Sequence, residues 1–259
     1  MREMLLSGQT FNIFGLEVPW YGTMIAIGML AGILCAYYIC RKKSIDTNMP
    51  INLALYALPC AIVGARIYYC ALNGVSSFWQ IFEVWNGGLA IYGGVIGGFL
   101  GVLLCCKIHK YNLLEACDLC APCLFLGQAI GRIGCYFAGC CYGIEPSVDY
   151  LKVFPVSVQI GGVWHLATFF YESVLDLLGV LTLLLLTGKV KEHGIVTSGY
   201  FIFYGTIRAI LEQYRDPKEC LMLGSFRASQ LLSVLLVITG CVLLVTILIK
   251  SHKKEAVNG

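Results

Sequence analysis

The 259-residue chain is 58% hydrophobic, only 13% charged, and carries a formal net charge of +3. A soluble domain holds roughly 25% charged residues, so this composition excludes an ordinary soluble domain and indicates a polytopic membrane protein. The small charge, without a basic stripe interleaved with aromatic residues, argues against a nucleic-acid partner. The first twenty residues have only short, interrupted apolar stretches, so we expect insertion to rely on internal helices rather than on a signal peptide.

Seven apolar segments are long enough for membrane-spanning helices, each of which needs about 20 residues. In chain order they are 19–40, 51–72, 88–106, 114–136, 165–187, 195–214 and 226–249. No internal repeat or low-complexity segment separates them. The expected fold is therefore all-α, with one domain, 1–259, of seven transmembrane helices.

Lysine and arginine gather after alternate spans, which predicts the orientation. They follow spans one, three, five and seven as Arg41 to Lys43, Lys107 and Lys110, Lys189 and Lys191, and Lys250 with Lys253 and Lys254. The other connections hold few cations. Because lysine and arginine concentrate in cytoplasmic loops, the N-terminus is expected outside and the C-terminus in the cytoplasm.

Two of the outer connections are more than short links. Residues 73–92 contain Trp79 and Trp85, aromatic residues typical of the membrane interface. Residues 137–164 contain the β-branched run "VFPVSVQIGGVW", which favours a short hairpin. We expect these two loops to form a small extracytoplasmic head.

Several ionisable side chains lie inside the apolar segments, where each costs about 2.5 to 3.5 kcal/mol to insert. They are Arg66, Asp118, Arg132, Glu172, Asp176, Arg208 and Glu212. Each of them can be a structural ion-pair partner or part of a functional site. Their number in one chain favours a functional site.

Span six carries Arg208, Glu212 and Arg215 on one helical face, where Glu212 can pair with both arginines. Arg132 and Arg66 add guanidiniums from other spans. Converging arginines bind phosphate or carboxylate in a bidentate manner. Since the abundant anion of a membrane is a lipid headgroup, the pattern predicts a phospholipid site open to the outer leaflet.

The run "NGGLAIYGGVIGGFLG" places Gly93 and Gly94 directly after Tyr92. Small residues at spacings of three and four permit close helix contact. Paired glycines can also let backbone N–H groups approach an anion or a lipid glycerol. Both interpretations stay open, with Tyr92 as a candidate hydrogen-bond donor.

Taken in chain order, these motifs resemble the prolipoprotein diacylglyceryl transferase family of bacterial inner membranes. The resembling segments are "VPWYGTMIAIG", "VGARIYY", "FEVWNGGLAIYGGVIGG", "DLCAPCLFLGQAIGRIGCYFAGCCYG", "HLATFFYES", "YGTIRAILEQYRDP" and "ASQLLSVLLVITG". Asp118, Pro122, Gly131, Arg132 and Gly134 align with the family signature. Seven spans with an external N-terminus are what this resemblance also implies.

The resemblance implies a membrane transferase. The family moves the diacylglyceryl group of phosphatidylglycerol to the lipobox cysteine thiol of a preprolipoprotein, forming a thioether and releasing glycerol 1-phosphate. It implies catalytic roles for Arg132 and Arg208, and no metal or cofactor. We add Tyr92 to the catalytic candidates as a hydrogen-bond donor, although it stands at a position where the family differs. The implied substrate-binding residues are Tyr21, Arg66, Gly93, Gly94, Glu172, Glu212 and Arg215.

This chain departs from the family pattern at several positions. Cys135 and Ala138 stand where the family has asparagine, Cys140 where it has glutamate, and Tyr92 where it has histidine. The proline that follows the family's histidine is absent beside His165. Two alternatives therefore stay open: a paralogous enzyme that moves a phosphatidylglycerol-derived group to another acceptor, and a non-catalytic phospholipid-binding or transport protein.

Cysteine occurs 14 times, mostly inside apolar spans, where it behaves as a small apolar residue. Cys117, Cys120 and Cys123 form one helical stripe, a simpler interpretation than an iron–sulfur motif. The possible reactive thiols are Cys135, Cys140 and Cys141. Packing, a redox or disulfide role, and a chemical role beside the substrate are all open for the Cys140–Cys141 pair.

Overall fold

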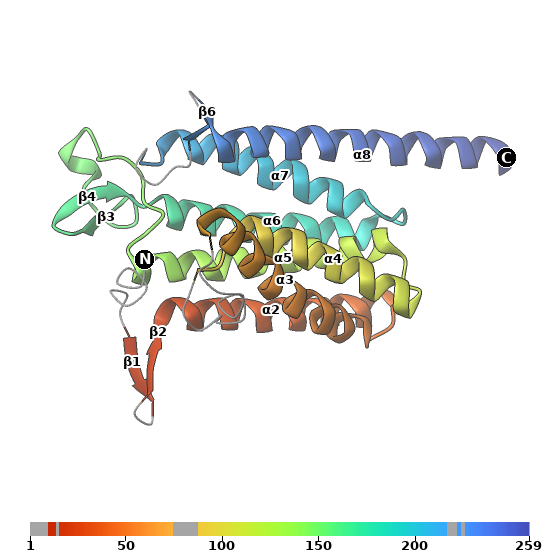
Figure 1. Ribbon diagram of the computed structural model, residues 1–259. Coiled ribbons are helices and arrows are strands. Elements are labelled where there is room, and N and C mark those ends of the chain that lie inside the picture. The colour runs from red at the N-terminus through yellow and green to blue at the C-terminus, as the bar shows by residue number, and fades with distance from the viewer. Residues whose placement is uncertain (1–9, 14–15, 75–87, 217–221, 224–225, 259) are drawn as a thin grey trace. The chain divides into compact units, whose positions relative to one another are not determined.

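The computed structural model describes the chain except residues 1–9, 14–15, 75–87, 217–221, 224–225 and 259 (Figure 1). The described residues form seven α-helices. These are α2 (Trp20–Lys43), α3 (Met49–Asn73), α4 (Ile91–His109), α5 (Leu113–Ala138), α6 (Thr168–Lys189), α7 (Ile195–Leu211) and α8 (Ala228–Asn258). Each coincides with a predicted span, so the prediction of an all-helical, polytopic membrane protein is confirmed.

Six of the seven described helices are long and apolar enough to cross a membrane. The exception is α7, whose 17 residues extend about 25 Å at 1.5 Å per residue. The chain continues beyond α7 as a 3₁₀ turn, η4 (Glu212–Tyr214). This turn accounts for the last three residues of the predicted sixth span, 195–214.

The strands among the described residues form three two-stranded antiparallel pairs. They are β1 (Thr10–Ile13) with β2 (Leu16–Pro19), β3 (Ser157–Ile160) with β4 (Val163–Leu166), and β5 (Met222–Leu223) with β6 (Phe226–Arg227). Gly161 and Gly162 turn β3 into β4 with φ values of 59° and 85°, which glycine adopts without steric cost. The hairpin expected in 137–164 is therefore confirmed, whereas most of 73–92 lies outside the described residues.

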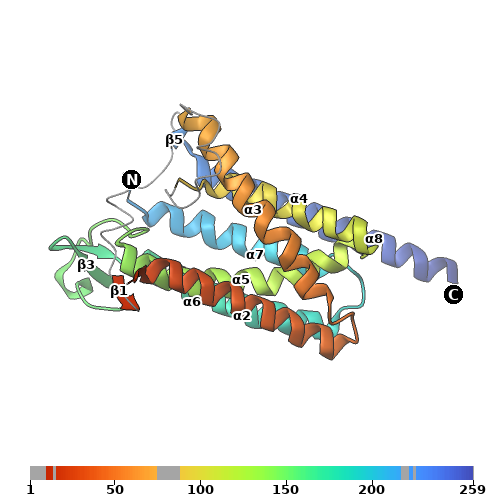
Figure 2. The same ribbon diagram turned by 60° about the horizontal axis from the view of Figure 1, so that its bottom comes forward.

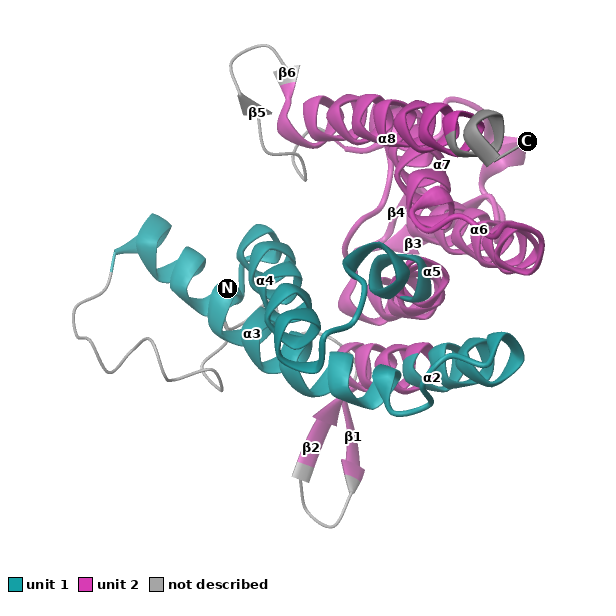
Figure 3. Ribbon diagram, turned by 90° about the vertical axis from the view of Figure 1, so that its right-hand side faces the viewer, with its two compact units in different colours: residues 1–7, 33–119 teal, residues 8–32, 120–259 magenta. Residues whose placement is uncertain are grey.

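The chain divides into two compact units, shown separately coloured in Figure 3. Unit 1 comprises residues 1–7 and 33–119, and unit 2 comprises residues 8–32 and 120–259. The boundaries fall inside α2 and α5, so each of these helices contributes one part to each unit.

Unit 1 is built on close packing of α3 against α4 (Figure 2). A Cβ atom added to Gly64 would lie 2.5 Å from the Gly93 carbonyl oxygen, and one added to Gly101 would lie 2.6 Å from the Tyr56 carbonyl oxygen. Helix backbones approach this closely only where the side chain is absent. Gly93 thus serves close helix contact, one of the two interpretations of the glycine run.

Unit 2 contains the antiparallel helices α6, α7 and α8 with part of α5 (Figure 1). Phe125 of α5 is fully buried and lies against Gly179 of α6, where a Cβ atom would be 2.9 Å from its ring. Gly205 and Gly240 allow the same closeness between α7 and α8. The Ser173 hydroxyl of α6 donates to the Ala129 carbonyl of α5 at 2.7 Å, which fixes the register of these two helices.

Candidate active site

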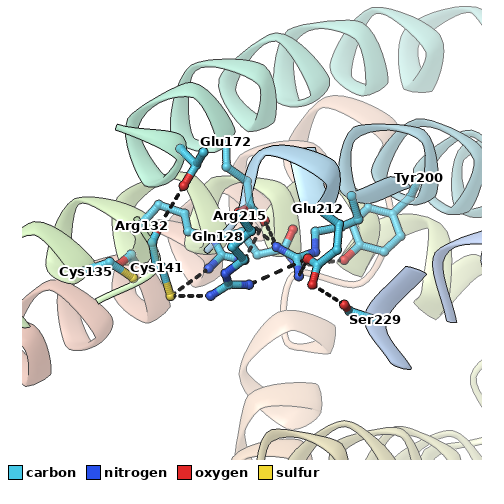
Figure 4. Close-up of polar contacts among 12 residues, drawn as sticks. Gln128, Arg132, Cys135, Cys141, Glu172, Tyr200, Glu212, Arg215 and Ser229 are labelled. Carbon is cyan, nitrogen blue, oxygen red and sulfur yellow. Dashed lines mark hydrogen bonds and ion pairs between the residues drawn. The ribbon is translucent and has the colours of Figure 1, made fainter. Parts of the chain in front are cut away.

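An arginine–carboxylate network lies inside unit 2 (Figure 4). The Glu172 carboxylate of α6 forms ion pairs with two guanidiniums. Its oxygens lie 2.5 Å from Arg132 Nη2 of α5 and 3.2 Å from Arg208 Nη1 of α7. Glu212 Oε2 of η4 forms ion pairs with Arg208 at 2.9 Å and with Arg215 at 3.8 Å. The glutamate side chains are 4% and 2% exposed, so they are held away from water while the arginines remain partly accessible.

The charges of this network do not cancel. Three guanidiniums face two carboxylates, so the paired groups retain one positive charge. Buried charges are tolerated when they are paired and hydrogen-bonded. This residual positive charge attracts an anion, and the guanidinium N–H groups on the accessible side can donate hydrogen bonds to it.

The end of α7 sets the positions of Arg208, Glu212 and Arg215. Arg208 occupies the last turn of α7, where a cation interacts favourably with the helix dipole. Glu212 then begins η4, so the predicted face continues into a tighter turn. The predicted pairing of Glu212 with both arginines is confirmed.

Arg227, just before α8, and Ser229, in the first turn of α8, hold Glu212 in place. The sequence analysis predicted neither residue. The Ser229 hydroxyl donates to Glu212 Oε1, and Arg227 Nη1 donates to the Glu212 carbonyl oxygen. Ser229 lies in the apolar motif "ASQLL", and no pattern in the sequence links its hydroxyl to Glu212. Through the Ser229 contact, α8 also helps to position the Glu212 carboxylate.

The loop after α5 is tied to the segment after η4. Gly143 pairs with Arg215 in a β-bridge, and the Ile144 N–H donates to the Tyr214 carbonyl at 2.9 Å. The Gly143 N–H donates to the Leu166 carbonyl of β4 at 2.8 Å. Arg215 is therefore fixed beside the cysteines of this loop by backbone contacts.

Cys135, Cys140 and Cys141 form a thiol cluster, with their Sγ atoms all within 4.8 Å of one another. The chain reverses after α5 through Gly139 and Cys141, whose φ values are 59° and 61°. The Cys140 N–H donates to the Cys135 carbonyl at 3.1 Å, which folds the pair back over the helix end. The two predicted groups, arginines and possible reactive thiols, thus lie together.

Cys141 links the thiol cluster to the arginines, as the dashed contacts in Figure 4 show. Its Sγ atom lies 2.8 Å from Arg215 Nη2 and 3.8 Å from Arg132 Nη1. Hydrogen bonds with the thiols of Cys135 and Cys140, and then the charges of Arg215 and Arg132, lower the pKa of Cys141. The contacts of Cys140 with the neighbouring thiols raise the pKa of Cys140.

Apolar side chains surround the thiol cluster. Val158 of β3 and Phe169 of α6 are buried against Cys135, and Tyr21 of α2 packs on the same group. A Cβ atom on Gly134 would lie 3.2 Å from the Tyr21 ring, so glycine admits the ring to the face of α5. The predicted site residue Tyr21 therefore lies beside the thiols.

The remaining predicted site residues, Arg66, Tyr92, Gly93 and Gly94, belong to unit 1. Arg66 Nη1 donates to the Gly88 carbonyl at 3.2 Å. Tyr92 lies with its ring centroid 6.3 Å from that of Tyr68. Their participation in the site of unit 2 stays a prediction.

Asp176 is the second carboxylate that the sequence places inside the fifth span. It is fully buried one turn beyond Glu172 on α6, and neither carboxyl oxygen has a hydrogen-bond partner among the described residues. His165 Nδ1 lies 3.1 Å from the Gly143 carbonyl oxygen, where it supports the loop that carries the thiols.

A positively charged, partly accessible arginine network in a polytopic membrane protein has the charge needed to bind anionic membrane lipids. Comparison with known proteins identifies the family. The family model for prolipoprotein diacylglyceryl transferase matches residues 9–246. The chain belongs to this family, as its motifs indicated.

Similar proteins cover nearly the whole chain. Phosphatidylglycerol–prolipoprotein diacylglyceryl transferase 1 of Clostridium perfringens is 34% identical over 253 residues, covering 95% of this chain and 96% of that protein. Phosphatidylglycerol–prolipoprotein diacylglyceryl transferase of Clostridium botulinum strain Loch Maree is 36% identical over 252 residues, covering 95% and 97%. The protein of that name from Clostridium novyi is 36% identical over 249 residues, covering 93% and 96%.

Proposed function

We propose that this chain transfers the diacylglyceryl group of phosphatidylglycerol to the lipobox cysteine thiol of a preprolipoprotein, with release of glycerol 1-phosphate. The relatives' names supply the donor and the class of acceptor. The observation that carries the proposal in this chain is the network in which Arg132 and Arg208 share Glu172 and keep a residual positive charge.

The geometry suits the departure of a phosphate. The acceptor sulfur attacks the glycerol carbon of the diacylglyceryl group, the S–C bond forms, and the C–O bond to phosphate breaks. The leaving phosphate gains negative charge, which pre-positioned guanidiniums stabilise most where water is excluded. Arg132 and Arg208 bind this phosphate, Glu172 and Glu212 hold the guanidiniums in place, and Arg215 joins them to the cysteine loop.

The membrane arrangement follows from the same residues. We propose seven spans, with α7 and η4 together extending about 31 Å, close to the roughly 30 Å of a bilayer core. Lysine and arginine after alternate spans support insertion in the inner membrane of a bacterium with the N-terminus outside and the C-terminus in the cytoplasm. The donor then enters from the outer leaflet, and one membrane domain holds the whole site.

The test is transfer of the diacylglyceryl group to a synthetic lipobox peptide by the full-length protein in phosphatidylglycerol vesicles, followed by mass spectrometry. We expect Arg132→Ala and Arg208→Ala each to slow the transfer by about 100-fold or more, because each removes a donor that stabilises the leaving charge. Arg41→Ala, at the exposed end of α2, is the matched control and should retain the rate.

Two results would count against the proposal. Turnover of phosphatidylglycerol without peptide modification would favour a paralogous enzyme with another acceptor, consistent with the substitutions at Cys135, Ala138, Cys140 and Tyr92. Binding of phosphatidylglycerol without turnover would favour a lipid-binding or transport protein.

A further inference from the structure

We propose that Cys135, Cys140 and Cys141 form a three-thiolate site for Zn²⁺, and that the open fourth position binds the thiol of the acceptor. The metal site is argued from the geometry of the thiol cluster. The role of the fourth position rests on the proposed function, and the two parts are tested separately.

The spacing of the sulfur atoms is close to that of a metal site. All three Sγ atoms lie within 4.8 Å of one another. A Zn–S bond of about 2.3 Å places tetrahedral thiolates about 3.8 Å apart, so closing the cluster requires sulfur movements of about 1 Å or less. Rotation about the cysteine Cα–Cβ bonds supplies movements of this size. Among the described residues, this is the one group of cysteine, histidine and acidic side chains near enough to share an ion.

The local fold holds the cluster in this form. Cys135 is fixed on the last turns of α5, and the Thr168 hydroxyl donates to the Cys141 carbonyl at 2.8 Å. Cys141 has a φ of 61°, a conformation that is uncommon for residues other than glycine. Contacts from α6 and from the Gly143–Arg215 bridge maintain it, and it turns the Cys141 sulfur toward Cys135 and Cys140.

The surrounding charges favour three thiolates and a divalent cation. Such a centre carries one net negative charge, and Arg215 and Arg132 approach the Cys141 sulfur at 2.8 and 3.8 Å. Apolar walls from Val158 and Phe169 lie on the buried side. Cys135 is buried, whereas Cys140 and Cys141 are partly exposed, which leaves an accessible side for a fourth ligand.

The ligand set selects the metal. Thiolates bind soft or borderline ions such as Zn²⁺ and Cu⁺, whereas Mg²⁺ and Ca²⁺ prefer oxygen ligands. Zn²⁺ with three protein ligands retains an open position in catalytic sites. The acceptor of the proposed reaction is itself a thiol, a kind of ligand that Zn²⁺ binds well at an open fourth position.

The chemical step then has a defined route for each proton and electron pair. A thiol that coordinates Zn²⁺ loses its proton, here to water, and binds as the thiolate. Its sulfur attacks the glycerol carbon, the S–C bond forms, and the C–O bond breaks. The oxygen leaves with the bonding pair as glycerol phosphate beside Arg132 and Arg208. The neutral thioether is a weaker ligand than the thiolate and is released.

Metal binding is tested with the full-length, reduced, metal-free protein in detergent, titrated with Co²⁺ and then with Zn²⁺. We expect one equivalent of Co²⁺, a thiolate-to-cobalt charge-transfer absorption, and its loss on displacement by Zn²⁺. Cys135→Ser, Cys140→Ser and Cys141→Ser should each weaken binding at least about tenfold. Cys241→Ser, at an exposed position on α8, is the control and should bind normally.

A conservative variant separates ligand loss from misfolding. Cys140→His retains a zinc ligand of a different kind, so it should bind Co²⁺ with an altered absorption and more tightly than Cys140→Ser does. Failure of the reduced native protein to bind one equivalent, or equal binding by the three serine variants, overturns the site. So does a disulfide among these cysteines in protein extracted with its free thiols blocked.

The role of the metal is tested by comparing metal-free and Zn²⁺-loaded protein in the peptide-transfer assay. We expect metal-free protein to modify the peptide at least about 100-fold more slowly while binding phosphatidylglycerol equally well. Transfer at the full rate without metal overturns the metal's role and leaves the proposed function standing. Stoichiometric Zn²⁺ binding without any transfer supports the metal site and contradicts the proposed function instead.

Discussion

Glu172 joins two helices at the site, because guanidiniums from α5 and α7 both pair with its carboxylate. Arg132 comes from α5 and Arg208 from α7, and Glu172 lies between them on α6 with 4% of its side chain exposed. Removing the shared anion leaves two cations that repel each other in a poorly solvated place. The network therefore depends on this residue both for stability and for the separation of the guanidiniums.

Glu172→Gln keeps the shape of the side chain and removes its charge. We expect a loss of about 3 to 5 kcal/mol in the free energy of unfolding, the usual cost of breaking a buried ion pair. Denaturant unfolding in detergent, followed by tryptophan fluorescence, measures the change. The matched control is Lys152→Ala, since Lys152 forms a 2.5 Å ion pair with the exposed Asp149. An equal loss in both variants would contradict the structural importance of burial here.

Asp46 gives a second prediction at the residue scale, and it lies outside the spans. The Asn48 backbone N–H donates to its carboxylate at 2.9 Å and the Tyr111 hydroxyl at 2.8 Å. These hydrogen bonds lower the pKa of Asp46, and the bond from the Asn48 backbone has the larger effect. Because the pKa is lowered on folding, the carboxylate stabilises unit 1 above its ordinary pKa, and this contribution disappears as the pH falls through the folded-state value.

Tyr111→Phe removes one of the two donors and should return the pKa of Asp46 toward its ordinary value. Carboxyl chemical shifts of labelled aspartate, followed by NMR over pH 2 to about 6, measure the change. Tyr150→Phe, an exposed tyrosine far along the chain in η3 (Asp149–Leu151), serves as the control. An unchanged titration of Asp46 in Tyr111→Phe would show that the hydroxyl does not hold this carboxylate.

At the scale of elements, hydropathy and charge predicted the helices because the bilayer imposes one length on every span. The helix ends differ from the expected bounds by a few residues, since turns and strands begin where the helices end. The α6 bounds, Thr168–Lys189, begin after the predicted residue 165 because His165 pairs within the β3–β4 hairpin. The glycine run was ambiguous from sequence alone, since it fits either close helix packing or anion binding.

The close packing of α3 and α4 can be tested with Gly101→Ala. The new Cβ atom would lie 2.6 Å from the Tyr56 carbonyl oxygen and 2.8 Å from Ala57 Cα, and backbone cannot move aside cheaply. We expect destabilisation of about 1 to 3 kcal/mol, typical of overpacking, measured as a lower unfolding midpoint. Gly188→Ala in α6 is the control, because nothing lies within 4 Å of its Cβ position. A neutral Gly101→Ala would contradict close packing at this seam.

For the whole molecule, the sequence could predict the charged residues that pair in the arginine–carboxylate network but not how this network is joined to the cysteines. The spacing of Arg208, Glu212 and Arg215 predicted their pairing, and the pairing is kept although Glu212 lies in η4 and Arg215 is extended. The contact of Cys141 with Arg215 depends on a reversal after α5 and on a bridge between segments 72 residues apart at Gly143 and Arg215, which no local pattern encodes. The same limit applies to the Ser229 hydroxyl that supports Glu212.

The orientation of the chain is the prediction that concerns the whole molecule. The β3–β4 turn at Gly161–Gly162 lies in a loop with few cations, whereas residues 44–47 follow the basic end of α2. Since lysine and arginine favour the cytoplasm, an epitope tag inserted between Gly161 and Gly162 should bind antibody in intact spheroplasts. A tag inserted after Ser44 should bind only after permeabilisation, and transfer activity in both tagged proteins confirms that each is folded. The reverse pattern would place the cysteine loop in the cytoplasm, on the wrong side for an outer-leaflet donor, because the thiols, the arginines and the hairpin belong to one unit.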